Sequence, residues 1–298
     1  MKKYFTIGIV ILLFILISIF PFVRGIRGEI TKELEVVFID VGQGDATLIN
    51  TPGGKHILID GGIGEGSFGS EDQGKKTILP YLRSHGIRHL DVVVGTHPDF
   101  DHIGGLVSII RAKNLTVGEV LDPGIAHPSG GYLDLLNAVK DSPEIKYRQP
   151  RAGDVLDWGE EVEVEVVSPP YLLKDNNESS IVIKLSYEDI SFLFTGDAAG
   201  IAENLMMGKY NYRLRSTILK AGHHGSKHSS TEEFLKKVRP EVAVFSCGKE
   251  NKYGHPNEET IERLKKIGAE MYRTDDQGTI TITTDGKDYQ VKTDKKDL

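Results

Sequence analysis

The chain has 298 residues, with 36 lysines and arginines against 43 aspartates and glutamates, so its formal net charge is −7. A content of 39% hydrophobic and 27% charged residues is typical of globular proteins and excludes a collagen-like or largely disordered chain. The single cysteine, Cys247, excludes an intramolecular disulfide framework and a cysteine-rich zinc site. The acidic balance argues against a broadly basic nucleic-acid surface, although a local basic groove or bound metal ions are compatible with it.

Residues 1–29 differ in composition from the rest of the chain. After Lys2 and Lys3, residues 4–23 carry no charge and consist mainly of Ile, Leu, Phe and Val. This length is enough to cross ~30 Å of hydrocarbon as a helix. No small-x-small site follows, which favours an uncleaved membrane anchor over a cleaved secretory signal. The short basic N-terminus predicts that residues 30–298 form an extracytoplasmic domain, anchored or, after cleavage, secreted.

From residue 33 onward the pattern is β-rich and then alternates between strands and helices, which is typical of one α/β domain. The predicted strands, in chain order, are 33–40, 46–50, 56–60, 90–96, 162–167, 181–187, 190–195, 217–221, 242–247 and 279–284. The predicted helices are 77–85, 103–113, 199–208, 231–238 and 257–267.

The most informative segment follows the predicted strand 90–96. It places His97, Asp99, Asp101 and His102 within six residues. Imidazole and carboxylate groups are ligands that suit zinc, manganese or iron. A polar, solvated loop is the alternative interpretation. Four potential ligands at the end of one apolar strand, where α/β sites tend to lie, favour a metal site.

Three further segments repeat this arrangement of an apolar strand, a potential ligand and a glycine. Asp60 follows strand 56–60, Asp197 follows strand 190–195, and the pair His223-His224 follows strand 217–221. Each one alone is compatible with an ordinary turn. Together they predict that His and Asp side chains converge at one edge of the sheet, in sufficient number for two metal ions.

These residues resemble the metallo-β-lactamase-fold hydrolases, whose motif H-x-[HD]-x-D-H is matched by residues 97–102. More closely, the chain resembles the C-terminal hydrolase domain of the ComEC family of competence DNA-uptake proteins. That resemblance rests on four further segments, namely residues 38–45 (FIDVGQGD), 220–226 (KAGHHGS), 254–256 (GHP) and 274–278 (TDDQG). It covers residues 33–284 and does not include the multi-helix channel of that family.

The resemblance implies an αββα sandwich, here preceded by one N-terminal transmembrane helix, with a binuclear metal site at one edge. It assigns His97 and Asp99 to a first ion, Asp101, His102 and His224 to a second ion, and Asp197 to a position bridging both. His223 is then expected to contact substrate or support a ligand. Which member of the pair His223-His224 is the ligand is left open at this stage.

The resemblance also bears on metal identity. Many family members have histidine in place of Asp99 and another histidine before the strand that precedes the bridging aspartate, where this chain reads residues 176–180 (NNESS). Fewer nitrogen ligands shift the preference from zinc toward manganese, so two divalent ions, Zn or Mn, are expected. Asp60 and Asp45 are expected to orient the ligand histidines. Supporting or substrate-binding positions are also expected at Asn177, Ser180 and Ser226.

The function implied by the resemblance is phosphodiester hydrolysis, with DNA as the expected substrate. A metal-bridging hydroxide would be the nucleophile, and Asp101 would orient it or accept its proton. His255 would contact the phosphate or protonate the leaving group; its alternative role is to cap the helix after Pro256. Cationic residues near the expected site would attract phosphates, and these are Lys220, Lys227, His228, Lys249 and Lys252, with Tyr253 beside them.

Two alternatives accompany this hypothesis. One is another small-ester hydrolase of the same fold, such as a phosphorylcholine esterase. The other is a non-catalytic, membrane-tethered DNA-binding module that keeps the metals structurally. The expected partners are a phosphodiester substrate, the membrane through the N-terminal helix, and DNA-transport machinery.

Overall fold

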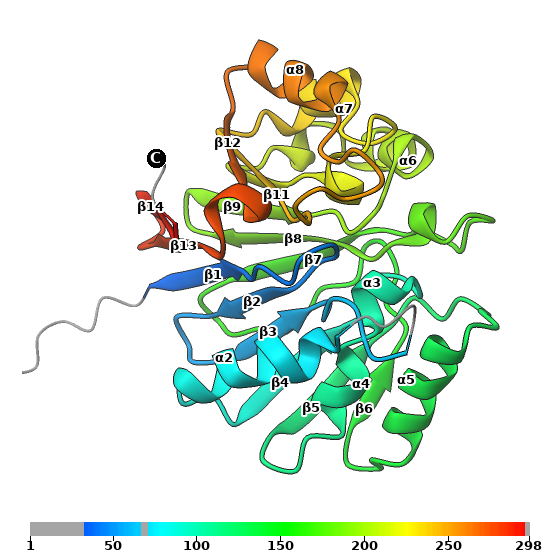
Figure 1. Ribbon diagram of the computed structural model, residues 1–298. Coiled ribbons are helices and arrows are strands. Elements are labelled where there is room, and N and C mark those ends of the chain that lie inside the picture. The colour runs from blue at the N-terminus through cyan, green and yellow to red at the C-terminus, as the bar shows by residue number, and fades with distance from the viewer. Residues whose placement is uncertain (1–32, 67–70, 296–298) are drawn as a thin grey trace, which may run out of the picture. The chain divides into compact units, whose positions relative to one another are not determined.

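The computed structural model describes residues 33–66 and 71–295 (Figure 1). The predicted membrane anchor lies outside the described residues. Within the described ranges, no helix combines the length and the apolar character needed to cross a membrane.

The first of two β-sheets has eight strands in the order β14-β13-β1-β2-β3-β4-β5-β6. Neighbours are antiparallel from β14 to β3 and parallel from β3 to β6. The strands are β1 (Leu34–Phe38), β2 (Thr47–Asn50), β3 (His56–Ile59), β4 (His89–Val94), β5 (Thr116–Leu121), β6 (Lys146–Arg148), β13 (Ile280–Thr284) and β14 (Tyr289–Thr293).

The second sheet has six strands in the order β12-β11-β10-β9-β8-β7. The neighbours from β12 to β9 are parallel, and β7, β8 and β9 are antiparallel. The strands are β7 (Glu163–Ser168), β8 (Val182–Tyr187), β9 (Ile190–Phe194), β10 (Ile218–Lys220), β11 (Val242–Phe245) and β12 (Glu270–Arg273).

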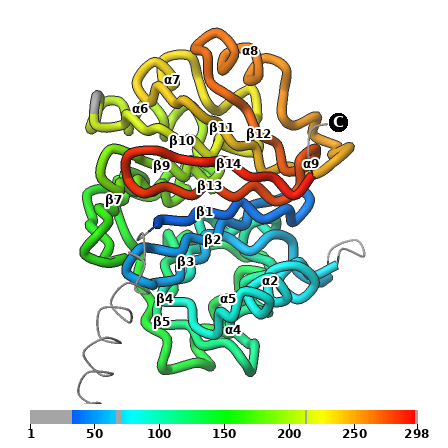
Figure 2. Tube along the Cα trace, turned by 90° about the vertical axis from the view of Figure 1, so that its left-hand side faces the viewer, coloured from blue at the N-terminus to red at the C-terminus, as the bar shows by residue number. Residues whose placement is uncertain are grey.

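Helices cover the outer face of each sheet (Figures 1 and 2). Those beside the first sheet are α2 (Leu79–Ser84), α3 (Phe100–Ile103), α4 (Leu106–Ile110) and α5 (Gly130–Lys140). Those beside the second sheet are α6 (Gly200–Tyr210), α7 (Glu232–Val238) and α8 (Glu258–Lys266), and α9 (Thr274–Gln277) follows β12. Short turns are a π-helical turn (Gly74–Ile78) and three 3₁₀ turns (Asn177–Ser179, Asn211–Leu214 and Gly222–Gly225).

Three apolar cores hold these layers together. The core between the sheets contains residues of both, such as Phe38 from β1 and Phe192 from β9, together with Trp158. A second core lies between the first sheet and its helices, and a third lies between the second sheet and its helices. The described chain therefore forms an αββα sandwich, since each sheet buries one face against the other sheet and one against helices.

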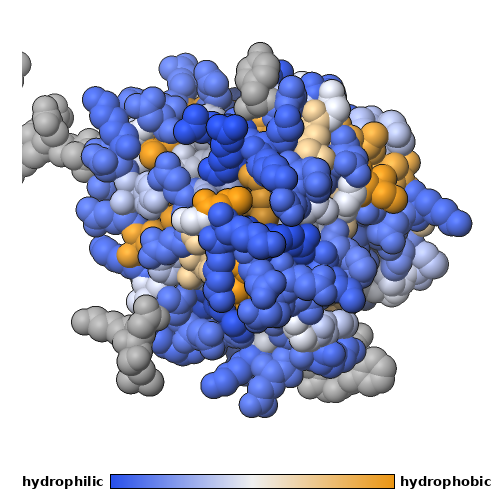
Figure 3. All heavy atoms as spheres, turned by 90° about the horizontal axis from the view of Figure 1, so that it is seen from above, coloured by the Kyte–Doolittle hydropathy of each residue, from blue (hydrophilic) through white to orange (hydrophobic). Residues whose placement is uncertain are grey.

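The outer surface is polar where the helices face water. The face shown in Figure 3 is predominantly hydrophilic, with hydrophobic side chains in small separate groups. Helix α8 illustrates the pattern: Thr260 and Leu264 are buried, whereas its lysines 265 and 266 are exposed. Such a pattern is typical of an amphipathic helix packed on one side only.

All the predicted strands and helices occur, with ends shifted by a few residues. One difference affects the site, because the predicted helix 103–113 begins earlier, at Phe100, and divides into α3 and α4 around Gly104 and Gly105. Asp101 and His102 therefore lie on a short helix. The elements β5, α5, β6, β12, α9 and β14 were absent from the sequence-based prediction.

Candidate metal centre

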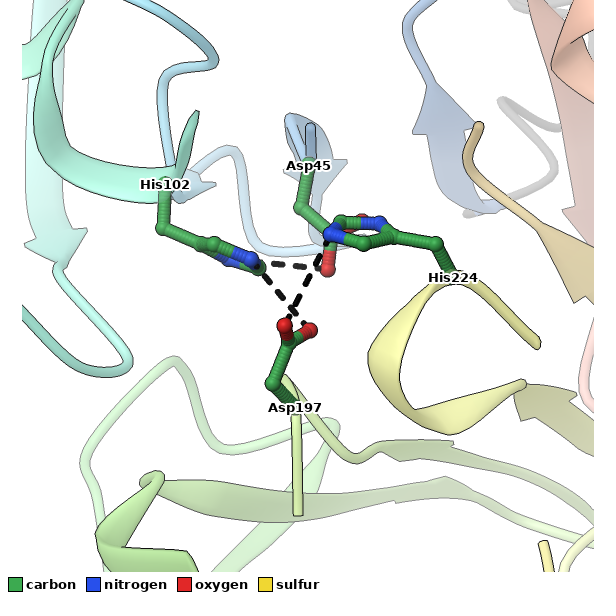
Figure 4. Close-up of side chains that lie close together, drawn as sticks. All are labelled: Asp45, His102, Asp197 and His224. Atoms are coloured by element: carbon green, nitrogen blue, oxygen red, sulfur yellow. Dashed lines mark ion pairs between the residues drawn. The ribbon is translucent and has the colours of Figure 1, made fainter. Parts of the chain in front are cut away.

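Loops of both sheets meet at one edge of the sandwich and place acidic and histidine side chains together. Asp45 lies between β1 and β2, His102 lies on α3, Asp197 follows β9, and His224 follows β10. Their side chains point toward one another (Figure 4), and one donor atom from each lies within 4.8 Å of all the others. All four residues are buried.

Gly44 permits the close approach of the Asp45 loop to helix α3. It has a φ of +130°, and a Cβ atom at this position would overlap the carbonyl oxygen of Asp101. The adjacent backbone N–H of Asp45 donates a hydrogen bond to that oxygen at 3.2 Å. Glycine is therefore required here both for its conformation and for its size.

Three buried histidines present the same ring nitrogen to the site. The Nδ1 atom of each contacts a fixed group: Asp60 Oδ2 at 2.8 Å from His102, the Ser246 carbonyl oxygen at 2.8 Å from His224, and Thr96 Oγ1 at 3.1 Å from His97. The Nε2 atom of each is buried and has no hydrogen-bond partner. These contacts favour the tautomer with the proton on Nδ1, which leaves the Nε2 lone pair available to a metal ion.

The carboxylate of Asp197 lies at the centre of these nitrogens. His102 Nε2 is 3.2 Å from Asp197 Oδ1, and His224 Nε2 is 3.6 Å from Asp197 Oδ2. His97 Nε2 and His223 Nε2 lie 3.9 and 3.6 Å from the same Oδ2. Ligand atoms that each lie about 2 Å from a common ion are separated by roughly these distances.

Asp99 and Asp101 approach the group from two sides. Asp99 Oδ2 is 3.8 Å from His97 Nε2, and Asp101 Oδ2 is 3.3 Å from His224 Nε2. The side chain of Asp99 is 39% exposed, and that of Asp101 is 28% exposed. The geometry thus pairs His97 with Asp99 and His224 with Asp101, on either side of Asp197.

The two adjacent histidines have an uncommon backbone conformation and different surroundings. His223 and His224 have φ values of 48° and 54°, in the left-handed region that costs a non-glycine residue about 1–2 kcal/mol. His224 is buried among the potential ligands, whereas the side chain of His223 is 31% exposed. The structure therefore favours His224 as the ligand of the pair and places His223 at the surface of the site.

Burial and neighbouring charge shift the pKa values of these groups strongly. Burial, with His102 nearby, lowers the pKa of His97 to about 3. Burial opposes protonation of His224 as well, but the carboxylates of Asp197 and Asp45 raise its pKa to about 10, so a metal ion that binds its Nε2 atom has to displace a proton. The pKa of Asp197 lies well below its usual value because His102 and His224 outweigh its burial. Buried imidazole nitrogens and carboxylates without other partners are a donor set that fits a divalent metal ion.

Lys220 is buried within the cluster. The expectation that it is one of the cations available to substrate is therefore wrong. Its ammonium group is buried, forms an ion pair with Asp45 and donates a 3.0 Å hydrogen bond to the Gly196 carbonyl oxygen. It lies 3.9 Å from Asp197 Oδ1. Its position in the otherwise apolar strand β10 was an available signal, since a buried lysine requires acidic partners.

Of the remaining predicted residues, Ser180 contacts the site, whereas the contact of Asn177 lies outside it. Ser180 Oγ accepts a hydrogen bond from the backbone N–H of Asp197 at 3.2 Å. Asn177 begins a 3₁₀ turn, and its backbone N–H donates to Asp175 Oδ1 at 2.9 Å. Burial raises the pKa of Asp99, and the side chain of the neighbouring Asn176, which sequence reasoning did not select, opposes this shift.

A cleft with a volume of about 600 Å³ adjoins the cluster, and its lining includes His223, Ser226, Lys227, Tyr253 and His255. The His255 ring is 5.4 Å from the His223 ring, and its Nδ1 atom is buried without a hydrogen-bond partner. Burial lowers the pKa of His255 to about 4. The alternative role of His255 as a helix cap is wrong, because Asn257 occupies the N-cap position of α8.

Comparison with known families gives one match over most of the chain. The profile described as "Metallo-beta-lactamase superfamily" matches residues 39–249. "ComE operon protein 3" of Bacillus subtilis is 32% identical over 263 residues, which cover 84% of this chain and 33% of that protein. "Competence protein ComA" of Neisseria gonorrhoeae is 32% identical over 250 residues, covering 84% of this chain and 32% of that protein. The chain thus spans about a third of the length of these relatives.

Solved structures resemble the chain in fold. A metallo hydrolase of Ignicoccus hospitalis, Igni18, superposes with a TM-score of 0.53 at 16% identity, over 84% of this chain and 98% of that one. CmlA, a diiron beta-hydroxylase of Streptomyces venezuelae, gives a TM-score of 0.52 at 15% identity, over 80% of this chain and 52% of that one. One is a hydrolase and the other a hydroxylase, so the fold alone does not determine the reaction.

Proposed function

We propose that this chain, which belongs to the metallo-beta-lactamase superfamily and is similar to competence proteins of the ComEC type, is a metal-dependent phosphodiesterase that cleaves DNA. The observation that carries the proposal is the convergence of partnerless Nε2 atoms from His97, His102 and His224 on the carboxylate of Asp197. Such a group is built to bind metal, and the family to which it belongs includes metal-dependent hydrolases.

The donor set divides into two halves that share Asp197. One half would hold an ion with His97 and Asp99, and the other would hold an ion with His224 and Asp101 beside His102. Divalent ions here, Zn or Mn, would supply Lewis-acid charge and lower the pKa of water. The carboxylates of Asp99 and Asp101 supply oxygen ligands, which manganese prefers.

The side chains that face the cleft would position the substrate. Asp101 is partly exposed at the edge of the cluster, so its carboxylate is placed to orient the attacking water and accept its proton. His255 lines the cleft beside His223, and we assign its ring to a hydrogen bond with a phosphate oxygen.

DNA is supported as the substrate by the names of the relatives and by nearby charge. The similar proteins are described as a competence protein and, for one 31% identical over 252 residues in Haemophilus influenzae, "Recombination protein 2". Lys227 and Tyr253 line the cleft, and the ammonium group of Lys252 lies 5.0 Å from the Tyr253 ring centroid. The proposal includes attachment to the membrane through residues 4–23, an extracytoplasmic domain, and action beside DNA-transport machinery.

Hydrolysis of bis-p-nitrophenyl phosphate by the full-length protein in mild detergent tests the proposal. We expect turnover with manganese or zinc and at least a hundredfold loss in His97→Ala and Asp197→Ala, because each change removes a ligand. His89→Ala is the matched control, since His89 is a half-exposed histidine at the start of β4. Single-stranded and duplex DNA would then be compared as substrates.

If bis-p-nitrophenyl phosphate is not hydrolysed, two other results would identify the alternative functions. Turnover of phosphorylcholine or carboxylic esters, without phosphodiester cleavage, would indicate a small-ester hydrolase. DNA binding that persists in a metal-loaded, folded protein without any turnover would indicate a non-catalytic binding module.

A further inference from the structure

A row of aromatic rings leads from the metal cluster to the surface along the cleft. His223 lies 3.6 Å from Asp197 through its Nε2 atom. The His223 and His255 ring centroids are 5.4 Å apart, and those of His255 and Tyr253 are 5.7 Å apart. Tyr253 thus lies two ring-to-ring steps from the residue that touches the cluster, within reach of a group attached to a phosphate at the site.

Tyr253 has the exposure and the contacts of a stacking surface. It is 54% exposed, and its ring is nearly parallel to that of His255, with an interplanar angle of 23°. Lys252 is exposed and its ammonium group lies over the Tyr253 ring, 5.0 Å from the centroid, so a base that stacks on this face displaces a flexible side chain. An exposed aromatic ring beside a cation is the combination with which proteins bind a base and its phosphate together.

The side chain of Asn251 makes several of the hydrogen bonds that hold the loop carrying Tyr253. Asn251 Oδ1 accepts hydrogen bonds from the backbone N–H groups of Tyr253, at 3.2 Å, and His255, at 2.9 Å. Asn251 Nδ2 donates to the carbonyl oxygens of Gly248 and His255. The loop is therefore ordered without a ligand, which reduces the entropy lost when a ligand stacks on it.

The charges along the cleft indicate where the phosphates and the bases of a substrate are expected to lie. Lys227 and Lys252 supply positive charge, whereas Glu258 and Glu259 line the same cleft at the start of α8. These carboxylates repel phosphate, so they disfavour a second phosphate at that end. An uncharged, flat group is compatible with both the ring of Tyr253 and the carboxylates.

We propose that Tyr253 stacks on a nucleobase next to the phosphate bound at the metal centre, so that the cleft selects single-stranded nucleic acid. This inference rests on the proposed phosphodiesterase function. The bases of a duplex are already stacked on their neighbours and are not available to the ring, whereas unpaired bases are. Small esters without a base would gain nothing from Tyr253.

The test compares binding of two fluorescent probes by anisotropy, using the full-length protein in mild detergent with manganese, and both probes carry phosphorothioate linkages that slow hydrolysis. One probe is oligothymidylate of about ten nucleotides, and the other is an abasic deoxyribose-phosphate strand of the same length. We expect the native protein to bind oligothymidylate about tenfold more tightly than the abasic strand. Tyr253→Leu should abolish this ratio, and Tyr253→Phe, which keeps the ring, should retain it.

Two further measurements separate the effect of the Tyr253 ring from effects of charge and of misfolding. Lys252→Met should weaken the binding of both probes equally, because it removes a charge and leaves the ring. Thermal melting of each variant checks folding, and the exposure of Tyr253 predicts that it is unchanged. A native protein that binds both probes equally or neither probe, or a Tyr253→Leu variant with an unchanged ratio, would overturn the inference. Failure of the phosphodiesterase proposal is seen separately, as absence of bis-p-nitrophenyl phosphate turnover with metal.

Discussion

At the scale of single residues, Asp60 shows how a carboxylate outside the cluster defines the state of a ligand. Its Oδ2 atom accepts hydrogen bonds from His102 Nδ1 and Thr96 Oγ1, both at 2.8 Å, and its Oδ1 accepts from the Thr96 backbone N–H at 2.8 Å. Every hydrogen-bond partner of Asp60 is a donor, so this position requires a group that only accepts hydrogen bonds. Asp60 thereby fixes both the ring orientation and the protonated nitrogen of His102.

Asp60→Asn is predicted to weaken metal binding about 10- to 100-fold. The amide places N–H donors where only acceptors fit, so His102 loses its Nδ1 partner or reverses its tautomer. Competition with a coloured chelator measures the affinity. Asp157→Asn serves as the control because the Asp157 side chain is 88% exposed. Equal affinities in the Asp60→Asn variant and the native protein would show that Asp60 does not set the state of His102.

The sequence was sufficient to select His97, Asp99, Asp101, His102, Asp197 and the pair His223-His224, because each is a potential ligand at the end of an apolar strand; the choice of His224 within the pair came only from the structure. The structure brings all of them together. Contacts that involve the backbone could not be predicted from the sequence. The Ser246 carbonyl oxygen contacts His224, and the Asn251 side chain binds backbone groups of its own loop; no residue-type pattern reports either geometry.

At the scale of elements, one buried carboxylate joins α6 to the start of α7. Glu203 on α6 accepts hydrogen bonds from the backbone N–H groups of Ser230 and Thr231 and from Thr231 Oγ1. Thr231 is the N-cap of α7, so the carboxylate lies at the positive end of that helix. Burial nevertheless outweighs these donors and raises the pKa of Glu203 to about 7.

This shift predicts a pH dependence of stability. Because the folded state holds the proton more tightly than the unfolded chain, whose pKa is 4.5, Glu203 stabilises the fold fully below pH 4.5. That contribution, up to about 3 kcal/mol, decreases as the pH rises through about 7. Urea unfolding at several pH values measures it. Glu203→Gln should remove this part of the slope, and an unchanged slope would contradict the assignment.

The elements that the sequence did not reveal lack a clear local pattern, for more than one reason. Strand β5 contains Gly118, and α5 opens with Gly130 and Gly131, so glycines interrupt the periodic patterns that indicate a strand or a helix. Strand β14 resembles the polar tail that follows it, because none of its residues is fully buried. Its strand conformation comes from pairing with β13, a contact made in three dimensions.

At the scale of the whole molecule, the candidate metal centre joins the two sheets. His97 and Asp101 come from connections of the first sheet, whereas Asp197 and His224 come from connections of the second. The apolar core between the sheets already holds them together. Bound metal would add a second link at one edge, made by ligands that no other group in the site satisfies.

Removal of metal is therefore predicted to lower thermal stability. Binding to the folded state alone adds about 2.7 kcal/mol when free metal exceeds its dissociation constant a hundredfold, equivalent to about 5 °C or more in Tm for a domain of this size. Differential scanning fluorimetry with manganese and with EDTA measures the difference. Asp197→Ala should show no response to either addition. If neither manganese nor EDTA changes the Tm of the native protein, the result would argue against a metal centre.

The order of the ligands along the chain has a consequence for synthesis. Asp45 and His102 leave the ribosome long before Asp197 and His224 are made, yet the site needs all four. Early segments of the chain offer only an incomplete set of donors, so metal capture has to wait until β10 and the turn after it have been translated and have folded. An ion bound at the centre would consequently be determined by what is available where folding is completed, and not where translation begins.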